Sequence, residues 1–113
     1  MSNEQAIETE EALAAAAAVR EALWSVEDPE LRMSILELGL IYNVAMVDEA
    51  TVSVTMTLTS PACPVGPLLE SLVRQAAQSV EGVETAAVEI TFDPPWDPKV
   101  MASDDVKLVL GIW

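Results

Sequence analysis

The nine residues from Thr51 to Thr59 alternate strictly between polar and apolar side chains, and this run constrains the fold more than any other feature of the sequence. A period of two places the apolar residues on one face of a strand and the polar residues on the other. The run Leu40–Val47 precedes it across the short segment Asp48–Ala50, so the two runs form a predicted β-hairpin. The predicted core face of the second strand carries Val52, Val54, Met56 and Leu58.

The other elements follow from the same kind of periodicity. The segment Thr59–Pro64 ends the alternation, and apolar residues then recur at helical spacing from Pro64 to Val80. A helix over Glu4–Val26, a strand over Val83–Phe92 and a short amphipathic segment over Ser103–Leu110 complete the chain. We therefore expect an α/β (α+β) fold, a single small domain in the order α-β-β-α-β-α. Its three-stranded mixed sheet is covered by helices, with a right-handed crossover between the parallel strands.

Three expectations concern packing. The first helix repeats apolar residues at helical spacing, which predicts a buried stripe that includes Leu13 and Leu23. We expect Trp24 and Trp113 to pack in the core or at its edge. The outer face of the second strand is typical of a solvated strand face and carries Thr55, Thr57 and Thr59.

The composition excludes several functions. Five lysines and arginines against nineteen aspartates and glutamates give a net charge of -14 at pH 7, so phosphate neutralisation cannot drive binding to nucleic acid or to an anionic membrane. The sequence has no histidine, which excludes serine–histidine and cysteine–histidine catalysis. Its single cysteine cannot by itself form a disulfide, a zinc site or an iron-sulfur site. With an acidic start and no targeting segment, a cytoplasmic location is expected.

That cysteine, Cys63, lies at the predicted junction between the second strand and the helix that follows. Pro64 at the first helical position makes Cys63 the predicted N-cap residue, where free backbone N–H groups and the helix dipole stabilise a thiolate. A thiolate is both a nucleophile and a metal ligand. The alternative is a small buried cysteine that fits a tight turn.

Two carboxylates, Asp28 and Glu30, flank a proline in the loop after the first helix. Such a pair can serve acid–base chemistry or bind a hard cation, and the proline limits how far the two groups relax from one another. The structural alternative is that Asp28 caps the turn and Glu30 is solvated.

The loop Asp93–Pro98 is rich in proline. Its fixed backbone presents Trp96 at a low entropic cost, which makes Trp96 a candidate partner-binding residue. The alternative is that Trp96 covers the end of the core.

Four segments in this order resemble the SufT and PaaD-like family of metal-sulfur cluster assembly factors. They are Asp28–Leu31, Leu38–Tyr42, Leu58–Pro64 and Asp93–Pro98 with Met101. The resemblance extends from Val19 to Ile112, so we interpret residues 19–113 as the assembly-factor domain. Residues 1–18 are interpreted as an acidic, alanine-rich N-terminal extension and the start of the first helix.

The resemblance implies a compact α/β domain that acts in the maturation of iron-sulfur proteins. By motif, it places the functional site at Asp28, Glu30, Leu31, Thr59, Ser60 and Cys63, with Ser60 in place of the family's frequent second threonine. Cys63 is then a transient metal ligand or a thiol-transfer residue, with Asp28 and Glu30 nearby in space. The implied cofactor is a transient iron-sulfur cluster or iron, whose other ligands come from elsewhere because one thiolate cannot hold a cluster.

The implied partners are the iron-sulfur assembly machinery or client apo-proteins, without nucleic acid or membrane, and a homodimer stays open. We expect no enzymatic activity, because a thiol enzyme that uses Cys63 alone would lack a resolving cysteine and a histidine base. Two alternatives are a structural adaptor that docks a partner through the Trp96 loop and an accessory protein of a phenylacetyl-CoA ring-hydroxylating system. PaaD-type relatives of the second kind often continue into a cysteine-rich C-terminal part that this sequence does not contain, so the SufT-like interpretation is preferred.

Overall fold

In a computed structural model, the protein is described over residues 6–60 and 66–112. The elements are α1 (Glu10–Ala22), the 3-10 turn η1 (Leu23–Ser25), α2 (Ile35–Leu38), β1 (Ile41–Met46), β2 (Thr51–Met56), α3 (Gly66–Gln78), β3 (Thr85–Ile90), α4 (Pro98–Met101) and α5 (Asp104–Leu110). The predicted order is confirmed, and α2 and α4 are short additions to it. Over these two ranges, no helix has the length and apolar character needed to cross a membrane.

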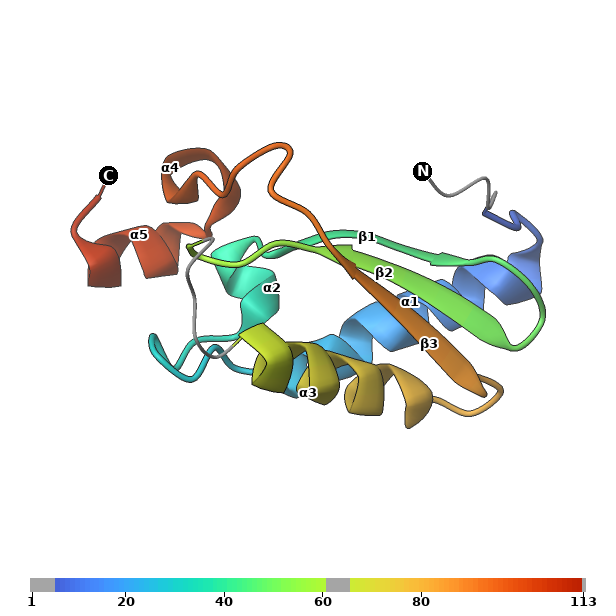
Figure 1. Ribbon diagram of the computed structural model, residues 1–113. Helices are drawn as coiled ribbons and strands as arrows, with labels where there is room; N and C mark the ends of the chain where they lie inside the picture. The colour runs from blue at the N-terminus through green and yellow to red at the C-terminus, as the bar shows by residue number, and fades with distance from the viewer. Residues whose placement is uncertain (1–5, 61–65, 113) are drawn as a thin grey trace.

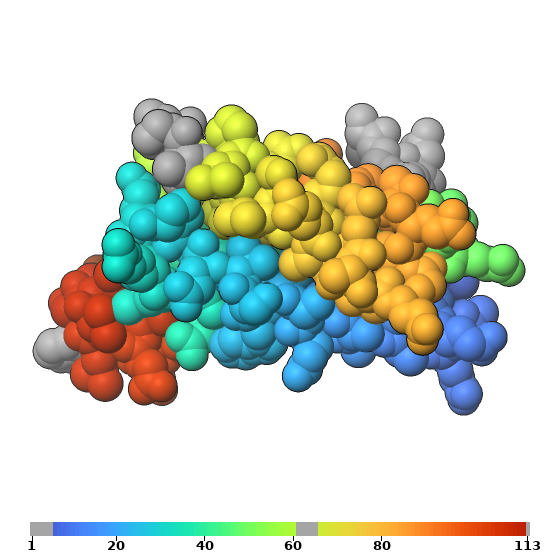
Figure 2. Space-filling model, turned by 90° about the horizontal axis from the view of Figure 1, so that it is seen from below, coloured from blue at the N-terminus to red at the C-terminus, as the bar shows by residue number. Residues whose placement is uncertain are grey.

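The sheet has β2 at its centre, paired antiparallel with β1 and parallel with β3. Val54 is in register with Val44 on one side and with Val88 on the other. Helices α1 and α3 cover the same face of the sheet, α1 against β1 and α3 against β3 (Figure 1). Seen from below, the two helices lie side by side (Figure 2). The predicted three-stranded mixed sheet is therefore confirmed.

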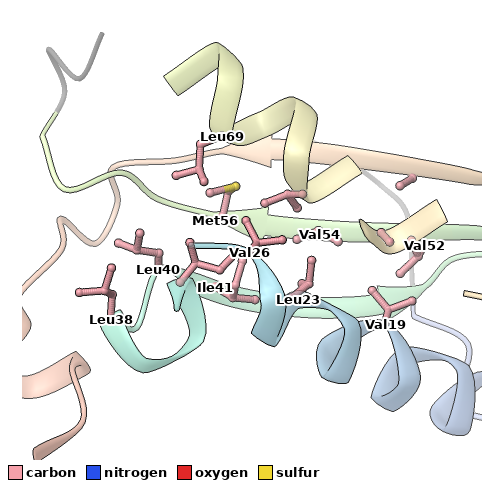
Figure 3. Packing of buried hydrophobic residues seen from close by; sticks show 14 of the residues in the cluster. Val19, Leu23, Val26, Leu38, Leu40, Ile41, Val52, Val54, Met56 and Leu69 are labelled. Atoms are coloured by element: carbon pink, nitrogen blue, oxygen red, sulfur yellow. The ribbon is translucent and has the colours of Figure 1, made fainter. Parts of the chain in front are cut away.

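The core lies between this helical layer and the sheet. All four residues on the predicted core face of β2 and its continuation are buried, as the alternation indicates. The helical layer contributes Val19, Leu23, Leu69, Val73 and Ala77. Figure 3 shows residues of both layers in one continuous cluster, with Leu69 near Met56. One cluster of apolar side chains thus holds the two layers together.

Three packing predictions were wrong. Leu13 is 56% exposed, because α1 carries small alanines around its circumference and the stripe through Val19 contacts the sheet. Trp24 lies in η1, after the end of α1, and is 49% exposed. Trp113 lies outside the described residues. Thr57 is fully buried rather than solvated. The pairing between the two strands continues by one hydrogen bond beyond the end of β2, because the Thr57 N–H donates to the carbonyl of Leu40, the residue before β1, at 2.8 Å.

Residues 98–112, which we name the C-terminal lobe, contain α4 and α5 and lie at one end of a molecule that measures 42 × 25 × 21 Å (Figure 1). Helix α4 begins with Pro98 after an Asp97 side chain that accepts the Lys99 N–H at 3.1 Å. Helix α5 begins after Ser103, whose hydroxyl accepts the Val106 N–H at 3.2 Å. Side-chain capping therefore defines the start of both short helices.

Candidate functional site

The loop between η1 and α2 is closed on itself by backbone hydrogen bonds. The Asp28 N–H donates to the Met33 carbonyl at 2.9 Å, and the Arg32 N–H donates to the Asp28 carbonyl at 2.7 Å. The Ile35 N–H donates to the Val26 carbonyl at 3.0 Å and closes the base of the loop. Arg32 has a φ of 57°, a conformation that residues other than glycine rarely adopt. The conformation of the loop Val26–Ile35 is therefore fixed by its own backbone.

Asp28 is the buried carboxylate of this loop and is only 1% exposed. Its Oδ1 accepts the N–H groups of Glu30 at 2.8 Å and of Leu31 at 3.1 Å, so the predicted capping of the turn is confirmed. Its Oδ2 is also buried and has no hydrogen-bond partner among the described residues. A buried polar oxygen without a partner costs about 1–3 kcal/mol, so Oδ2 is a costly feature of the fold.

The other two site residues in this loop are placed differently. Glu30 is exposed, whereas Leu31 is half-buried and packs against the core. The two carboxylates that flank Pro29 are therefore not equivalent. Asp28 is withdrawn from solvent and Glu30 faces it.

Cys63 lies outside the described residues, so its N-cap position and its distance from Asp28 and Glu30 stay predictions. The predicted junction has β2 before it and α3 after it. Thr59 is half-buried and Ser60 is exposed at the end of the first described range. A Cβ atom on Gly66 would lie 3.0 Å from Leu58 Cδ1, so the residues on either side of 59–65 lie against each other.

The Asp28 loop and the start of α3 lie at the same end of the molecule. Helix α3 contacts η1, the turn that leads into the loop. Figures 1 and 2 agree on this placement in two perpendicular views. The fold therefore brings the end of β2, the start of α3 and the Asp28 loop to one region.

A second buried oxygen was not predicted from the sequence. Thr57 Oγ1 and Asp28 Oδ2 are the two buried side-chain polar atoms without a hydrogen-bond partner in the part of the chain that the structure describes. Thr57 follows β2 directly and lies two residues before Thr59. No sequence signal distinguishes it from the other threonines of that row.

Trp96 is half-buried and fastened to α2. Its indole Nε1–H donates to the Leu38 carbonyl at 2.7 Å, and its ring packs against the core. Two residues before Trp96, the Pro94 carbonyl accepts a hydrogen bond from the Tyr42 hydroxyl at 2.7 Å. These contacts fit the alternative that Trp96 covers the end of the core, and its role as a partner-binding residue stays a prediction.

Gly39 is a point of close approach between the C-terminal lobe and the end of α2. It ends α2 with a φ of 80°, and a Cβ atom at this position would collide with the backbone of Met101. Only glycine satisfies both conditions. The Leu38–Tyr42 and Met101 segments are thus in direct contact.

The described residues do not by themselves form a metal site. Across 6–60 and 66–112, no three side chains of His, Cys, Asp or Glu are grouped closely enough to hold a metal ion. Among these residues, Asp28 Oδ2 is the one buried carboxylate oxygen without a hydrogen-bond partner. Further ligands would have to come from Cys63 or from another molecule.

Comparison with known proteins gives consistent relatives. Residues 16–90 match a family described as iron-sulfur cluster assembly protein. An Fe-S protein maturation auxiliary factor of Porphyromonas gingivalis is 43% identical over 79% of this chain and 84% of its own length. The Fe-S protein maturation auxiliary factor SufT of Staphylococcus aureus is 40% identical over 77% of this chain and 98% of its own length. An iron-sulfur cluster carrier protein of Synechocystis is 40% identical over 84% of this chain, which corresponds to 28% of the carrier.

Solved structures agree with the fold. A domain of unknown function from Bacillus anthracis has a TM-score of 0.82 and 32% identity, covering 90% of this chain and 96% of that domain. A conserved hypothetical protein from Thermotoga maritima has a TM-score of 0.76 and 35% identity, covering 99% of this chain and all of that protein. The expected family resemblance is confirmed by sequence and by structure. The chain therefore belongs to the iron-sulfur cluster assembly protein family.

Proposed function

We propose that this protein is an auxiliary factor in iron-sulfur protein maturation that binds iron or a cluster transiently, as cargo, on the way to client apo-proteins. Relatives named as maturation auxiliary factors and as a cluster carrier support this assignment. The sequence has a single cysteine, which is too few thiols to retain a cluster that is commonly held by four thiolates. A factor of this kind hands cargo on instead of storing it.

The observation that carries the proposal is the unpartnered oxygen of Asp28. Its Oδ1 is anchored by two backbone N–H groups, which fixes the direction of the carboxylate. Its Oδ2 is left buried without a partner among the described residues. A carboxylate oxygen is a ligand for iron, so bound iron would give Asp28 Oδ2 the partner that it lacks in the fold.

Cys63 supplies the second donor in this proposal. Thiolate is a soft ligand that suits iron-sulfur chemistry, and the sequence contains no other thiol. Asp28 and Cys63 together offer one oxygen and one sulfur. The assembly machinery or the client contributes the remaining ligands, so the cargo is shared between two proteins at the moment of transfer.

Two substitutions and one matched control test the proposal. Asp28→Asn keeps the size of the side chain and the Oδ1 acceptor but removes the charge. Cys63→Ser replaces the thiol by a hydroxyl, which can cap the helix at the predicted N-cap position, so the stability change should stay within about 1 kcal/mol. Thr57→Val is the control, because it also removes a buried unpartnered oxygen and leaves the proposed donors intact.

The readout is the activity of a cluster-dependent enzyme in cells that contain only the variant, together with the abundance of the variant. Asp28→Asn and Cys63→Ser should abolish support at normal abundance, whereas Thr57→Val should keep it. Anaerobic reconstitution with iron and sulfide, followed by visible absorption, should show the same ranking. Full support by Cys63→Ser would make the sulfur structural and favour the adaptor alternative. Full support by Asp28→Asn would remove the carboxylate from the proposed site.

A further inference from the structure

Strand β3 forms one edge of the sheet, and the side that faces away from β2 has no neighbouring strand in the described chain (Figure 1). The N–H groups of Thr85 and Thr91 donate to carbonyls at or next to the two ends of β2, at 3.1 Å and 2.8 Å. Every second residue of a parallel strand faces the same neighbour, so Ala87 and Glu89 also face β2. The main-chain N–H and carbonyl groups of the intervening residues face away from β2, and no other described segment is hydrogen-bonded to them. These residues are Ala86, Val88 and Ile90.

The opposite edge of the sheet, β1, is protected in two ways that β3 is not. Its pairing with β2 is irregular between Ile41 and Asn43. At its other end, the Ile7 N–H donates to the Met46 carbonyl at 2.8 Å. An irregular register and a covering segment both hinder the pairing of a further strand. The register of β3 is continuous over Thr85–Ile90, and this strand contains no proline or lysine, so β3 is the better template for an added strand.

The side chains of β3 indicate what an added strand would contact on each face. On the helix-facing side, Val88 and Ile90 pack against the core but are only half-buried. Val54, which is in register with Val88 at the centre of the sheet, is fully buried. On the other face, Ala87 and Glu89 are exposed. An added strand would therefore cover apolar surface with the residues on one of its faces and meet the Glu89 carboxylate with those on the other.

The charge around β3 indicates the chemistry of the partner. Residues 81–93 contain no lysine or arginine, and their carboxylates are all exposed: Glu81, Glu84, Glu89 and Asp93. The ion pairs found within the described part of the chain include none of these four residues. A second copy would bring the same carboxylates and its own net charge of -14, which disfavours the pairing of two β3 edges. A segment that carries lysine or arginine would instead be attracted to this edge.

We propose that the outer edge of β3 binds an extended, basic segment of a partner protein as a further strand of the sheet. Main-chain hydrogen bonds to the three outward-facing residues supply the affinity, as in other complexes that extend a sheet. Apolar residues of the segment lie beside Val88 and Ile90, and the lysine or arginine residues that alternate with them lie beside Glu89. The contact uses no atom of Asp28 or Cys63, so it is independent of the proposed function.

A peptide of about eight residues that alternates valine with lysine is the probe for this edge. Fluorescence anisotropy of the labelled peptide, titrated with the full chain at physiological salt, measures its dissociation constant. The matched control is the same peptide with two adjacent central residues N-methylated, which keeps the charge but removes main-chain donors. N-methylation should raise the dissociation constant at least about tenfold. A first peptide that does not bind, or equal binding of the two peptides, would overturn the proposal.

Hydrogen exchange, followed residue by residue by NMR, locates the contact. In the free chain, the amides of Val88 and Ile90 should exchange faster than those of Ala87 and Glu89, which face β2. The valine–lysine peptide should slow exchange at Val88 and Ile90 at least about tenfold. Slow exchange at these two amides in the free chain would mean that the edge is already covered. Slowing that grows with protein concentration alone would identify a second copy as the occupant, and either result would overturn the proposal.

A pair of charge variants tests the role of Glu89. Glu89→Lys should raise the dissociation constant of the valine–lysine peptide at least about tenfold, which corresponds to about 1.4 kcal/mol. Glu21→Lys makes the same change in net charge at an exposed site on α1 and should raise it about twofold or less. Both side chains are exposed, so circular dichroism should show that both variants keep the fold. Equal weakening by the two variants would mean that net charge alone attracts the peptide, and the proposed edge contact would be wrong.

Discussion

The Asp28 loop and the C-terminal lobe both border α2, but they are held in opposite ways. The loop Val26–Ile35 is closed by hydrogen bonds between residues at most nine positions apart, and it buries a carboxylate. The lobe is held by contacts with residues far away in the sequence, such as the Ser103 N–H that donates to the Glu37 carbonyl at 2.8 Å. The loop is therefore a preorganised local unit, while the lobe depends on α2 for its position.

The two regions also differ in their relation to the family. The loop lies inside the matched range 16–90, and the lobe lies beyond it. The loop is rigid and partly withdrawn from solvent, as a site that presents one fixed oxygen requires. The lobe has no net charge and exposes three large apolar side chains, those of Val100, Leu108 and Val109. Separate substitutions should therefore affect one region and spare the other.

The largest expected loss of stability is at Gly39, where the end of α2 meets the lobe. Gly39→Ala should lower the free energy of unfolding by about 3 kcal/mol or more, because the new Cβ meets the Met101 backbone and the positive φ is strained. Gly82→Ala is the control, with a φ of 92° and no atom within 4 Å of the added Cβ. It should cost about 1–2 kcal/mol, the left-handed strain alone. Chemical denaturation measures both, and equal losses would show that the lobe can move away from α2 freely.

The next largest effects are the stability losses on removal of two capping side chains, Asp28 in the loop and Ser103 in the lobe. Asp28→Ala leaves the N–H groups of Glu30 and Leu31 without their acceptor and should cost about 2 kcal/mol of global stability. Ser103→Ala removes one half-buried cap and should cost about 1 kcal/mol or less. Hydrogen exchange should show that the second loss is confined to α5. Global loosening by Ser103→Ala would contradict the independence of the loop.

The third expected effect concerns the fastening of the Trp96 loop. Trp96→Phe keeps an aromatic ring but removes the hydrogen bond to the Leu38 carbonyl, at a cost of about 1 kcal/mol. Hydrogen exchange of α4 and α5 should become faster, while the amides of Asp28 and Arg32, which are hydrogen-bonded within the loop, should exchange at their original rate. Faster exchange at those two amides would mean that the loop is supported by the lobe.

The smallest expected effect lies outside both regions, in the β1–β2 turn. The pKa of Asp48 lies below its ordinary value, mainly because its carboxylate accepts the Ala50 N–H at 2.8 Å and also a hydrogen bond from the Thr51 side chain. A lowered pKa in the folded state contributes stability above the ordinary pKa and loses it as the pH falls through the folded value. Asp48→Asn should therefore be slightly less stable than the wild type at neutral pH. The two should become equal well below about pH 4, as denaturation midpoints would show.

The regular elements were predictable because their signals are local. The alternation at Thr51–Thr59 and the helical spacing before Val80 depend only on neighbouring residues, and both elements were confirmed in type. Strand β2 ends at Met56, before the predicted Thr59, and the predicted helix start at Pro64 lies outside the described residues. Helices α2 and α4 also have start signals in the sequence. Ser34 with Glu37 has the spacing of a capping box, and Asp97 before Pro98 is a typical helix start.

Burial was harder to predict than secondary structure. The turn made by Asp28 was predictable from its residue type, but its 1% exposure was not, because distant segments determine what covers it. Thr57 belongs to a polar row and is buried for the same reason. On α1, alanines surround the helix, so the sequence pattern could not decide which stripe faces the sheet, and Leu13 was assigned to the wrong side.

The hydrogen bond between Trp96 and Leu38 joins two residues that are synthesised at different times. The two residues are 58 positions apart, whereas the bonds of the Asp28 loop lie within ten residues. A chain that leaves the ribosome from its N-terminus can close the loop early, because every partner has already emerged. The end of α2 has to wait until Trp96 and Met101 have been synthesised, long after α2 itself. Until then the Leu38 carbonyl and Gly39 face solvent or a chaperone, so a segment that is translated much later completes this end of the molecule.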